Sequence, residues 1–358
     1  MAIHGEGRSR ATIYDVAEAA GVSSATVSRV FSGGNSVAAA TRDRVLAVAD
    51  SLGFRLNPLA RNLSRGTSDV VAVMLPDVRH PFFSELLRGL QWAAFRQGYI
   101  TLVFNTGGDP DLERRYLDGL LSRQVEYVLA VGLVLDRAQV EGYVSAGLKF
   151  IALDRPLKHS KTMLLQSDNH DGARLATGHL LGLGHRRIAH IAGPAGVAPI
   201  HDRHRGYLAA LAEAGIAADE SLVVQSEFSE QGGSRALEEL DRRGVDYTAV
   251  FAADDLIAIG ILSAAQAGGR RVPKDLSVVG FDDVLPARLI VPALTTVRQD
   301  AIGLSERAVQ AIVSPEGRDP RHTFVLPVSL VIRGSTGMPP KSSAASRRRN
   351  RGATDRRH

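Results

Sequence analysis

The stretch from Thr12 to Phe31 constrains the fold of this chain more than any other, because it specifies two short helices and a sharp turn. Thr12 is a favourable helix N-cap, and Asp15 three residues later suits a capping box. Gly21 fits the turn, since glycine adopts a positive φ without steric cost. Ser23 is placed to cap the second helix. We therefore predict a helix-turn-helix here.

The second helix of this motif combines an apolar face with a short-armed polar face. Val27, Val30 and Phe31 are spaced to point inward. The outward positions are Ser24, Ala25, Ser28 and Arg29. Hydroxyls can reach phosphates or base edges, and an arginine can bind guanine in a bidentate manner. The pattern predicts a helix that enters the DNA major groove; a small helical bundle without a role in DNA binding is the alternative.

A third helix and a short linker segment follow. We expect Thr41 to cap the third helix, whose apolar positions at Val45, Val48, Ala49 and Leu52 keep helical spacing. Residues 11–56 then form a compact all-α headpiece. Residues 57–66 begin with Asn-Pro, a helix start, but a helix of about six residues is marginal in water. We expect this segment to become helical only on DNA; an ordinary linker is the alternative.

The chain beyond residue 66 alternates apolar runs with amphipathic stretches. The predicted strands are Val70–Leu75, Ile100–Asn105, Val128–Val131, Phe150–Leu153, Ile188–Ile191, Leu222–Gln225, Ala249–Ala252 and Val278–Phe281. Apolar strands that alternate with helices indicate parallel sheets covered on both faces. We predict an α/β core of two doubly wound lobes over residues 67–337. The first lobe is expected at about 67–160 plus 293–325, and the second at about 161–292 plus 326–337.

Polar residues that follow these strands are the candidate ligand-binding residues. Asp154, Asp254 and Asp282 each come at or just after the end of a predicted strand, where ligands bind in such sheets. Arg203 is expected to start a helix after the loop at residues 192–197. Carboxylates paired with an arginine in a cleft suit hydroxyl-rich ligands such as sugars. The alternative for any one aspartate is a helix N-cap.

The chain resembles the lactose/galactose repressor family. The resemblance rests on Thr12-Ile13, Asp15-Val16-Ala17, Ala20-Gly21-Val22-Ser23, Thr26-Val27-Ser28-Arg29-Val30, Gly53-Phe54, Asn57, Ala60-Arg61 and Leu63 in the first part of the chain. In the rest it rests on His80-Pro81-Phe82-Phe83, Leu153-Asp154-Arg155, Arg203 with Gly206-Tyr207, Asp254-Asp255, Val279-Gly280-Phe281-Asp282-Asp283 and Gln299. It implies a periplasmic-binding-protein-like core and a dimeric, ligand-responsive repressor of transcription that binds a palindromic operator.

The resemblance also implies site residues. The DNA-binding set is Thr12, Ser23, Ser24, Ala25, Thr26, Ser28, Arg29, Asn35, Arg61 and Leu63. Ser24 and Ala25 help to choose the operator, and Leu63 opens a base step in the minor groove. The effector-binding set is Phe82, Phe83, Asp154, Arg203, Asp254 and Asp282.

Two departures from the family pattern bear on the effector. Asp254 replaces the asparagine often found there, and residues 201–205 are unusually charged. A sugar is the expected ligand, with a sugar phosphate or a purine as alternatives.

The distribution of charge and the composition of the chain bear on its partners and its location. Residues 1–66 carry a net charge of +3 and residues 339–358 one of +6, against −4 between them. The basic headpiece suits phosphate contacts, and we expect the tail at residues 338–358 to be disordered. The chain has no cysteine, no secretion signal and no membrane-length apolar run, so we expect a cytoplasmic location, with the protein nucleoid-associated when bound to DNA.

A solute-binding protein would carry a signal peptide and no headpiece, and a nucleotide-dependent enzyme would carry a Gly-x-Gly-x-x-Gly turn after the first strand. We expect neither an enzyme nor a metal or cofactor site. We interpret His185 as a structural turn residue and Trp92 as core or interface packing.

Overall fold

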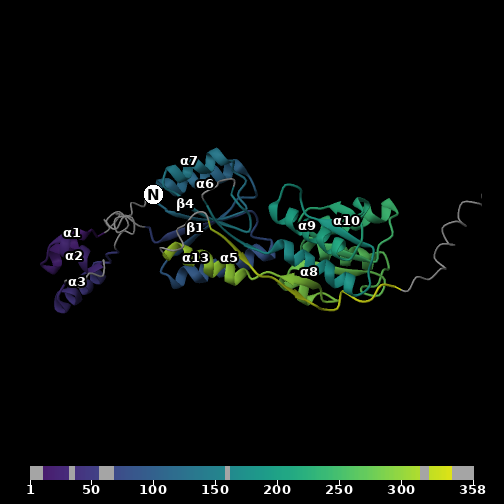
Figure 1. Ribbon diagram of the computed structural model, residues 1–358. Coiled ribbons are helices and arrows are strands. Elements are labelled where there is room, and N and C mark those ends of the chain that lie inside the picture. The colour runs from purple at the N-terminus through teal and green to yellow at the C-terminus, as the bar shows by residue number, and fades with distance from the viewer. Residues whose placement is uncertain (1–10, 32–36, 56–67, 158–161, 315–321, 341–358) are drawn as a thin grey trace, which may run out of the picture. The chain divides into compact units, whose positions relative to one another are not determined.

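The computed structural model describes residues 11–31, 37–55, 68–157, 162–314 and 322–340 (Figure 1). The chain separates into two compact units, residues 1–69 and residues 70–358. Among the described residues, no helix is both long enough and apolar enough to cross a membrane.

The first unit is a three-helix headpiece. Its helices are α1 (Ile13–Ala20), α2 (Ser24–Phe31) and α3 (Ala39–Ser51). The predicted capping box is confirmed, because the Thr12 side chain accepts from the Asp15 backbone N–H while the Asp15 carboxylate accepts from the Thr12 N–H. Gly21 has a φ of 63°, as the turn requires, and the Thr26 N–H donates to the Ser23 hydroxyl at 3.1 Å. The helix-turn-helix therefore forms through the local interactions that its sequence specifies.

The third helix differs from the prediction at its start, whereas it ends just before Gly53, which has a φ of 62°. It begins at Ala39, and its N-cap, Ala38, makes no side-chain hydrogen bond, so Thr41 is not the cap. The alanines before Thr41 are strong helix formers and extend the helix backwards. Leu52 is the C-cap of this helix and is exposed, so it does not join the predicted apolar face. The headpiece core instead uses Val16, Val27 and Val45, with Phe31 and Phe54 packed edge to face.

Several predicted DNA contacts cannot be located. The segment 57–66, with Arg61 and Leu63, and the loop residue Asn35 lie outside the described residues. The basic tail does too from residue 341 onward.

The second unit contains two six-stranded sheets. The first has the order β11-β5-β4-β3-β1-β2 and the second β12-β10-β9-β8-β6-β7. The strands of the first are β1 (Val70–Leu75), β2 (Ile100–Asn105), β3 (Tyr127–Val131), β4 (Lys149–Leu153), β5 (Met163–Ser167) and β11 (Thr323–Leu326). The strands of the second are β6 (Ile188–Ala192), β7 (Val223–Gln225), β8 (Ala249–Ala252), β9 (Ser277–Asp282), β10 (Thr295–Arg298) and β12 (Ser329–Val331). Every strand pair is parallel except β10 with β12, so the predicted parallel sheets are confirmed.

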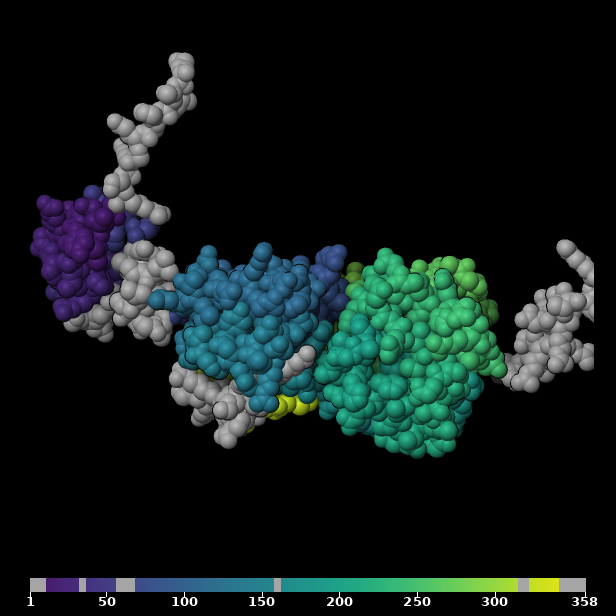
Figure 2. Space-filling model, turned by 90° about the horizontal axis from the view of Figure 1, so that it is seen from above, coloured from purple at the N-terminus to yellow at the C-terminus, as the bar shows by residue number. Residues whose placement is uncertain are grey.

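Helices cover these sheets on both sides. They are α5 (Pro81–Arg96), α6 (Pro110–Ser122), α7 (Arg137–Ser145), α8 (Asn169–Gly182), α9 (Ala198–Glu213), α10 (Glu230–Arg243), α11 (Asp255–Ala267), α12 (Leu285–Leu289) and α13 (Ala301–Val313), with a short 3-10 helix at Glu220–Leu222. Helix α13 packs against α5, so it belongs to the first lobe. Figure 2 shows the first lobe in blue beside the second in green.

The lobe boundaries differ from those predicted. Strand β5 pairs with β4 and β11, so the first lobe extends to Ser167 rather than ending near residue 160. Strand β10 pairs with β9, so residues up to Arg298 belong to the second lobe rather than the first. The local sequence of neither strand states which sheet it joins, and only long-range pairing decides this. The chain therefore crosses between the lobes just after β5, β10 and β11.

Candidate ligand pocket and DNA-facing helix

A pocket lies between the two lobes, where the carboxyl ends of both sets of strands meet; its empty space, counted together with the solvent at its opening, is about 350 Å³. All six effector-binding candidates line it: Phe82, Phe83, Asp154, Arg203, Asp254 and Asp282. Residues that the candidate set missed also line it: His80, Arg155, Val197, Pro199, Ile200, Phe228 and Gln299. A wider hollow of about 1040 Å³ adjoins the pocket and shares His80, Phe83, Arg155 and Phe228 with it. The pocket is thus lined by polar and aromatic side chains, and two of the aromatic ones, Phe83 and Phe228, also line the adjoining hollow.

The three aspartates reach the pocket through backbone geometry at the strand ends. Asp154 follows β4 with a φ of 65°, and Asp282 ends β9 with a φ of 120°. These left-handed conformations are unusual for residues other than glycine and are concentrated at functional sites. Asp254 is the N-cap of α11, where its Oδ1 accepts from the Ile257 N–H at 2.7 Å. The N-cap interpretation of Asp254 is confirmed, and its other oxygen, Oδ2, lies against His80 in the pocket lining.

Arg203 is held rigidly by groups of the second lobe. It lies in the second turn of α9 rather than at the helix start, because the helix begins at Ala198. Its Nε donates to Asn169 Oδ1 at 2.8 Å and its Nη1 donates to the Ala253 carbonyl, while the guanidinium stacks on the Phe281 ring at 3.7 Å. Its Nη1 also lies 3.6 Å from Asp282 Oδ1. Arg203 is only 4% exposed, so these partners, rather than water, stabilise its positive charge.

Asp282 sits in an environment that opposes ionisation. Burial raises its pKa to about 7; the positive charges of Arg203 and His80 and a 2.7 Å hydrogen bond from Gln299 Nε2 only partly offset this effect, and Asp254 adds to it. Burial likewise raises the pKa of Asp255, behind the pocket wall, well above its usual range. A carboxyl with a pKa near neutrality can donate or accept a hydrogen bond, depending on its protonation.

The raised pKa of Asp282 predicts a specific pH dependence of stability. The folded carboxyl holds its proton up to about pH 7, whereas the unfolded one loses it near its ordinary value of 3.8. Its contribution to stability is therefore lost as pH rises through this window. We expect the free energy of unfolding of the wild type, relative to that of Asp282→Asn, to fall between about pH 4 and pH 7 and to level off above that. Urea titrations at several pH values measure this difference, and a constant or rising difference contradicts the assignment.

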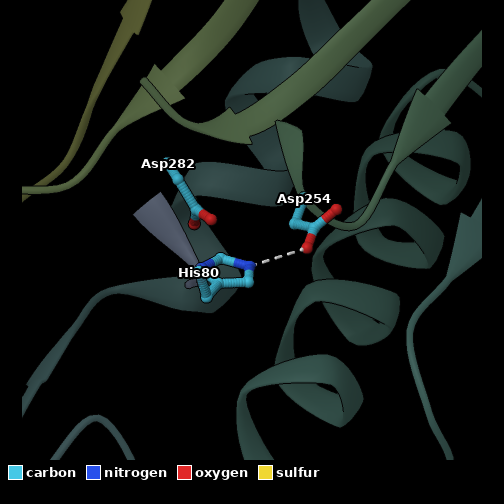
Figure 3. Close-up of side chains that lie close together, drawn as sticks. All are labelled: His80, Asp254 and Asp282. Carbon is cyan, nitrogen blue, oxygen red and sulfur yellow. Dashed lines mark hydrogen bonds and ion pairs between the residues drawn. The ribbon is translucent and has the colours of Figure 1, made fainter. Parts of the chain in front are cut away.

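His80 joins the two lobes at the pocket. It precedes α5 in the first lobe, and its Nε2 lies 3.2 Å from Asp254 Oδ2 of the second lobe (Figure 3). Its side chain is 12% exposed and that of Asp254 is 1% exposed. Burial alone would lower the pKa of His80, but the hydrogen bond to Asp254 and the charges of Asp282 and Asp254 outweigh burial and raise it. The imidazole is therefore biased toward its charged form.

The His80, Asp254 and Asp282 ligand atoms lie within 4.8 Å of one another, close enough to surround a metal ion. The surrounding contacts favour hydrogen bonding instead. Both Asp254 oxygens and Asp282 Oδ1 already have donors, and the Arg203 guanidinium stands next to Asp282. A divalent ion here would meet a fixed positive charge.

Three buried polar atoms of the pocket have no hydrogen-bond partner among the described residues. They are His80 Nδ1, Arg155 Nε and Gln299 Oε1. Buried polar groups are ordinarily satisfied, and exceptions point to water or a ligand. Together these atoms offer a ligand both donors and an acceptor.

Other sequence-based predictions are settled outside the pocket. His185 is fully buried, and its ring nitrogens meet the hydroxyls of Thr248 and Ser277 and the Gly337 carbonyl, as a structural role requires. Trp92 is 61% exposed, so it is not part of the core. It lies on the outer face of α5, which leaves the interface interpretation.

The DNA-facing candidates lie together on the headpiece. On and just before α2, Ser23, Ala25 and Arg29 are exposed, while Ser24, Thr26 and Ser28 are half-buried. Thr12 is exposed at the start of α1. Val27 and Val30 point into the core, so the polar residues of α2 share its outer face. Apart from Arg29, the residues on this outer face of α2 have short side chains.

Two family profiles match the chain. Residues 12–57 match "Bacterial regulatory proteins, lacI family", and residues 177–336 match "Periplasmic binding protein-like domain". The ribose operon repressor of Halalkalibacterium halodurans is 34% identical over 91% of this chain and 97% of its own length. The chain belongs to the lacI family of bacterial regulatory proteins. It is accordingly a DNA-binding transcriptional regulator and not an enzyme.

Other members of the lacI family agree in extent and architecture. The transcriptional regulator GalR of Escherichia coli is 34% identical over 92% of this chain and 96% of its own length. Among solved structures, a lac repressor dimer bound to operator and the anti-inducer ONPF matches with a TM-score of 0.81 and 28% identity, over 92% of this chain and all of that one. A complex of the transcriptional regulator CelR with cellobiose matches with a TM-score of 0.69 and 32% identity, over 91% of this chain and all of that one.

Proposed function

We propose that the protein represses transcription by binding a palindromic operator as a homodimer, and that a sugar in the interlobe pocket changes its affinity for DNA. The observation that carries this proposal is that one chain combines a helix-turn-helix with a two-lobed pocket lined by all six effector-binding candidates. One relative in this family is named a ribose operon repressor, and two related structures were solved with cellobiose and with ribose.

The chemistry of the pocket favours a sugar. Asp154, Asp254 and Asp282 offer acceptors for several hydroxyls, and Arg203 offers a donor at a fixed position. Phe82, Phe83 and Phe228 provide apolar faces for the C–H surface of a sugar ring. A purine or nucleoside is the second candidate, because the same three rings can stack on a base.

A phosphorylated effector receives less support. The charged loop that suggested one does not supply the pocket with cations, because His201 and Arg205 are exposed and only Arg203 lines it. Arg205 instead lies 3.4 Å from Asp202. In the pocket itself a phosphate would meet the carboxylates Asp154 and Asp254 as well as the cations Arg155 and Arg203.

The dimer is supported by exposed apolar side chains. Trp92 and Phe95 pack edge to face on the outside of α5, 61% and 71% exposed. Leu285, Leu289 and Val291 are more than half exposed beside α12. We infer that a second copy covers these side chains, as exposed apolar clusters commonly mark protein interfaces. Paired headpieces then match the two halves of a palindrome.

DNA recognition is assigned to the sequence-predicted set. Ser24 and Ala25 select the operator, Arg29 contacts a base or phosphate, and Thr12, Ser23, Thr26, Ser28 and Asn35 support the same interface. In the segment 57–66, Arg61 contacts DNA and Leu63 opens a base step in the minor groove. The protein is cytoplasmic and associates with the nucleoid through this contact.

The charge-matched pair Arg29→Ala and Arg44→Ala tests the DNA interface. Both arginines are exposed on the headpiece, but Arg29 lies on α2 and Arg44 on α3. We expect Arg29→Ala to weaken binding to a fragment from upstream of its own gene by about 10- to 100-fold, the worth of one good base contact. Arg44→Ala should have a much smaller effect. Equal losses in a fluorescence anisotropy titration would show that only net charge matters and would remove α2 from its assigned role.

A further inference from the structure

His80 is a first-lobe residue whose side chain is held mainly by the second lobe. Its Nε2 is within hydrogen-bond distance of Asp254, and its ring meets the edge of Phe228 at 6.1 Å. Both partners belong to the second lobe, whereas Phe83, at 5.0 Å on the other side, belongs to its own. We propose that protonated His80 latches the two lobes together by holding Asp254, until a ligand that donates a hydrogen bond to this carboxylate replaces the imidazole. The proposal rests on the proposed function, because that ligand is the effector.

The charges around His80 decide when the latch is closed. Asp254, Asp282 and Arg203 face it from the second lobe. Asp77 and Arg79 flank it on its own loop but pair with each other, and Arg155 and Glu230 line the adjoining hollow. The carboxylate in direct contact with the imidazole is Asp254 of the second lobe, so a proton on the imidazole strengthens the contact between the lobes. Loss of that proton weakens it.

The latch also restricts which ligands compete successfully. Asp254 Oδ1 is committed to the Ile257 N–H, so Oδ2 is the oxygen for which His80 and a ligand compete. A hydroxyl or amino group can donate to this oxygen in place of the imidazole. A fully ionised anion has no proton to donate and gains nothing there. His80 is therefore a positioning and selectivity residue, and ligand binding becomes weaker at acidic pH, where the imidazole competes best.

Measuring the separation of the lobes tests this proposal without DNA or ligand. The chain contains no cysteine, so Arg115→Cys on α6 and Glu238→Cys on α10 supply two exposed labelling sites, one in each lobe. In full-length protein, single-molecule energy transfer should give a narrow distribution of distances at about pH 6 and a broader one at about pH 8.5, on either side of the histidine range. His80→Ala should give the broad distribution at both pH values. An unchanged distribution in all four measurements would overturn the latch.

A double-mutant cycle, measured as Tm at two pH values, separates the contribution of the charge of His80 from that of its packing. The raised folded-state pKa gives stability that is present below about pH 6.5 and is lost as pH rises through the folded value. His80→Ala should lower Tm by about 2–4 °C at about pH 6 and by less at about pH 8.5. This pH-dependent part should shrink markedly in an Asp254→Asn background, which removes the hydrogen-bonded charge but leaves that of Asp282 and still caps α11. His201→Ala, which removes an exposed histidine, is the control.

A loss of equal size at both pH values would mean that His80 only packs between Phe83 and Phe228, and the latch would be wrong. Because neither measurement uses DNA or ligand, failure of the latch leaves the proposed function standing. Failure of DNA binding likewise leaves these measurements unaffected.

Discussion

Arg203→Met is expected to abolish the response to ligand and to lower the free energy of unfolding by about 3–5 kcal/mol at about pH 8. The methionine keeps an apolar stem against Phe281 but removes both donors. Asn169 Oδ1 and the Ala253 carbonyl then lose their hydrogen bonds, and Asp282 loses its nearest cation. Removing one partner from a buried charged network is costly because the others stay desolvated.

Arg205→Met is the matched control for this change. Arg205 lies two residues further along α9 with its side chain 60% exposed and one loose contact to Asp202. Its loss should cost less than about 1 kcal/mol, as for a surface ion pair. Urea unfolding measures both variants, and comparable losses would show that Arg203 does not organise the pocket. At lower pH the cost of Arg203→Met should shrink, because Asp282 can take up a proton.

Gly260→Ala is expected to destabilise the second lobe by about 1–3 kcal/mol or more, because helices α10 and α11 touch at this glycine. A Cβ at Gly260 would lie 1.9 Å from the Glu230 carbonyl oxygen, and one at Gly233 would lie 2.1 Å from that of Ile257. The Ser234 hydroxyl also donates to the Gly260 carbonyl at 3.0 Å. Neither backbone can move without opening the helix pair.

Gly178→Ala is the contrasting control. Gly178 lies within α8, where an added Cβ meets nothing within 4 Å. Alanine there should be neutral or should stabilise by about 0.4–1 kcal/mol, since it reduces the entropy of the unfolded chain. Thermal unfolding monitored by circular dichroism distinguishes the two variants. A stable Gly260→Ala protein would mean that the α10–α11 contact is looser than described.

Features encoded by neighbouring residues were predictable from the sequence. The Thr12 capping box, the Gly21 turn and the Ser23 cap each depend on contacts within about one helical turn, and all three are confirmed. Strands β1 to β4 and β6 to β9 were equally readable, because apolar runs between helices leave few alternatives. Thr41 failed as a cap because the alanines before it favour helix so strongly.

Features encoded by long-range pairing were not predictable. Nothing within β5 or β10 states which sheet it completes, so both lobe boundaries were misplaced. The role of His80 as a pocket residue was missed for the same reason, since its partner Asp254 is 174 residues away in the sequence. The six effector-binding candidates line one pocket, as expected, because strand ends and family motifs indicate where the ligand-binding positions lie in the sequence. Their hydrogen-bond partners, such as Asn169 for Arg203, came only from the structure.

The most direct test of the central claim is the affinity of the full-length protein for DNA from upstream of its own gene, with and without ligands. We expect a sequence-specific complex that weakens with salt. At least one member of a panel of pentoses, hexoses, disaccharides and nucleosides should change its Kd about 10-fold, a typical allosteric coupling. An Asp282→Ala protein should bind DNA but lose this response. Absence of a sequence-specific complex with every upstream fragment, or an Asp282→Ala protein with a full response, would contradict the account.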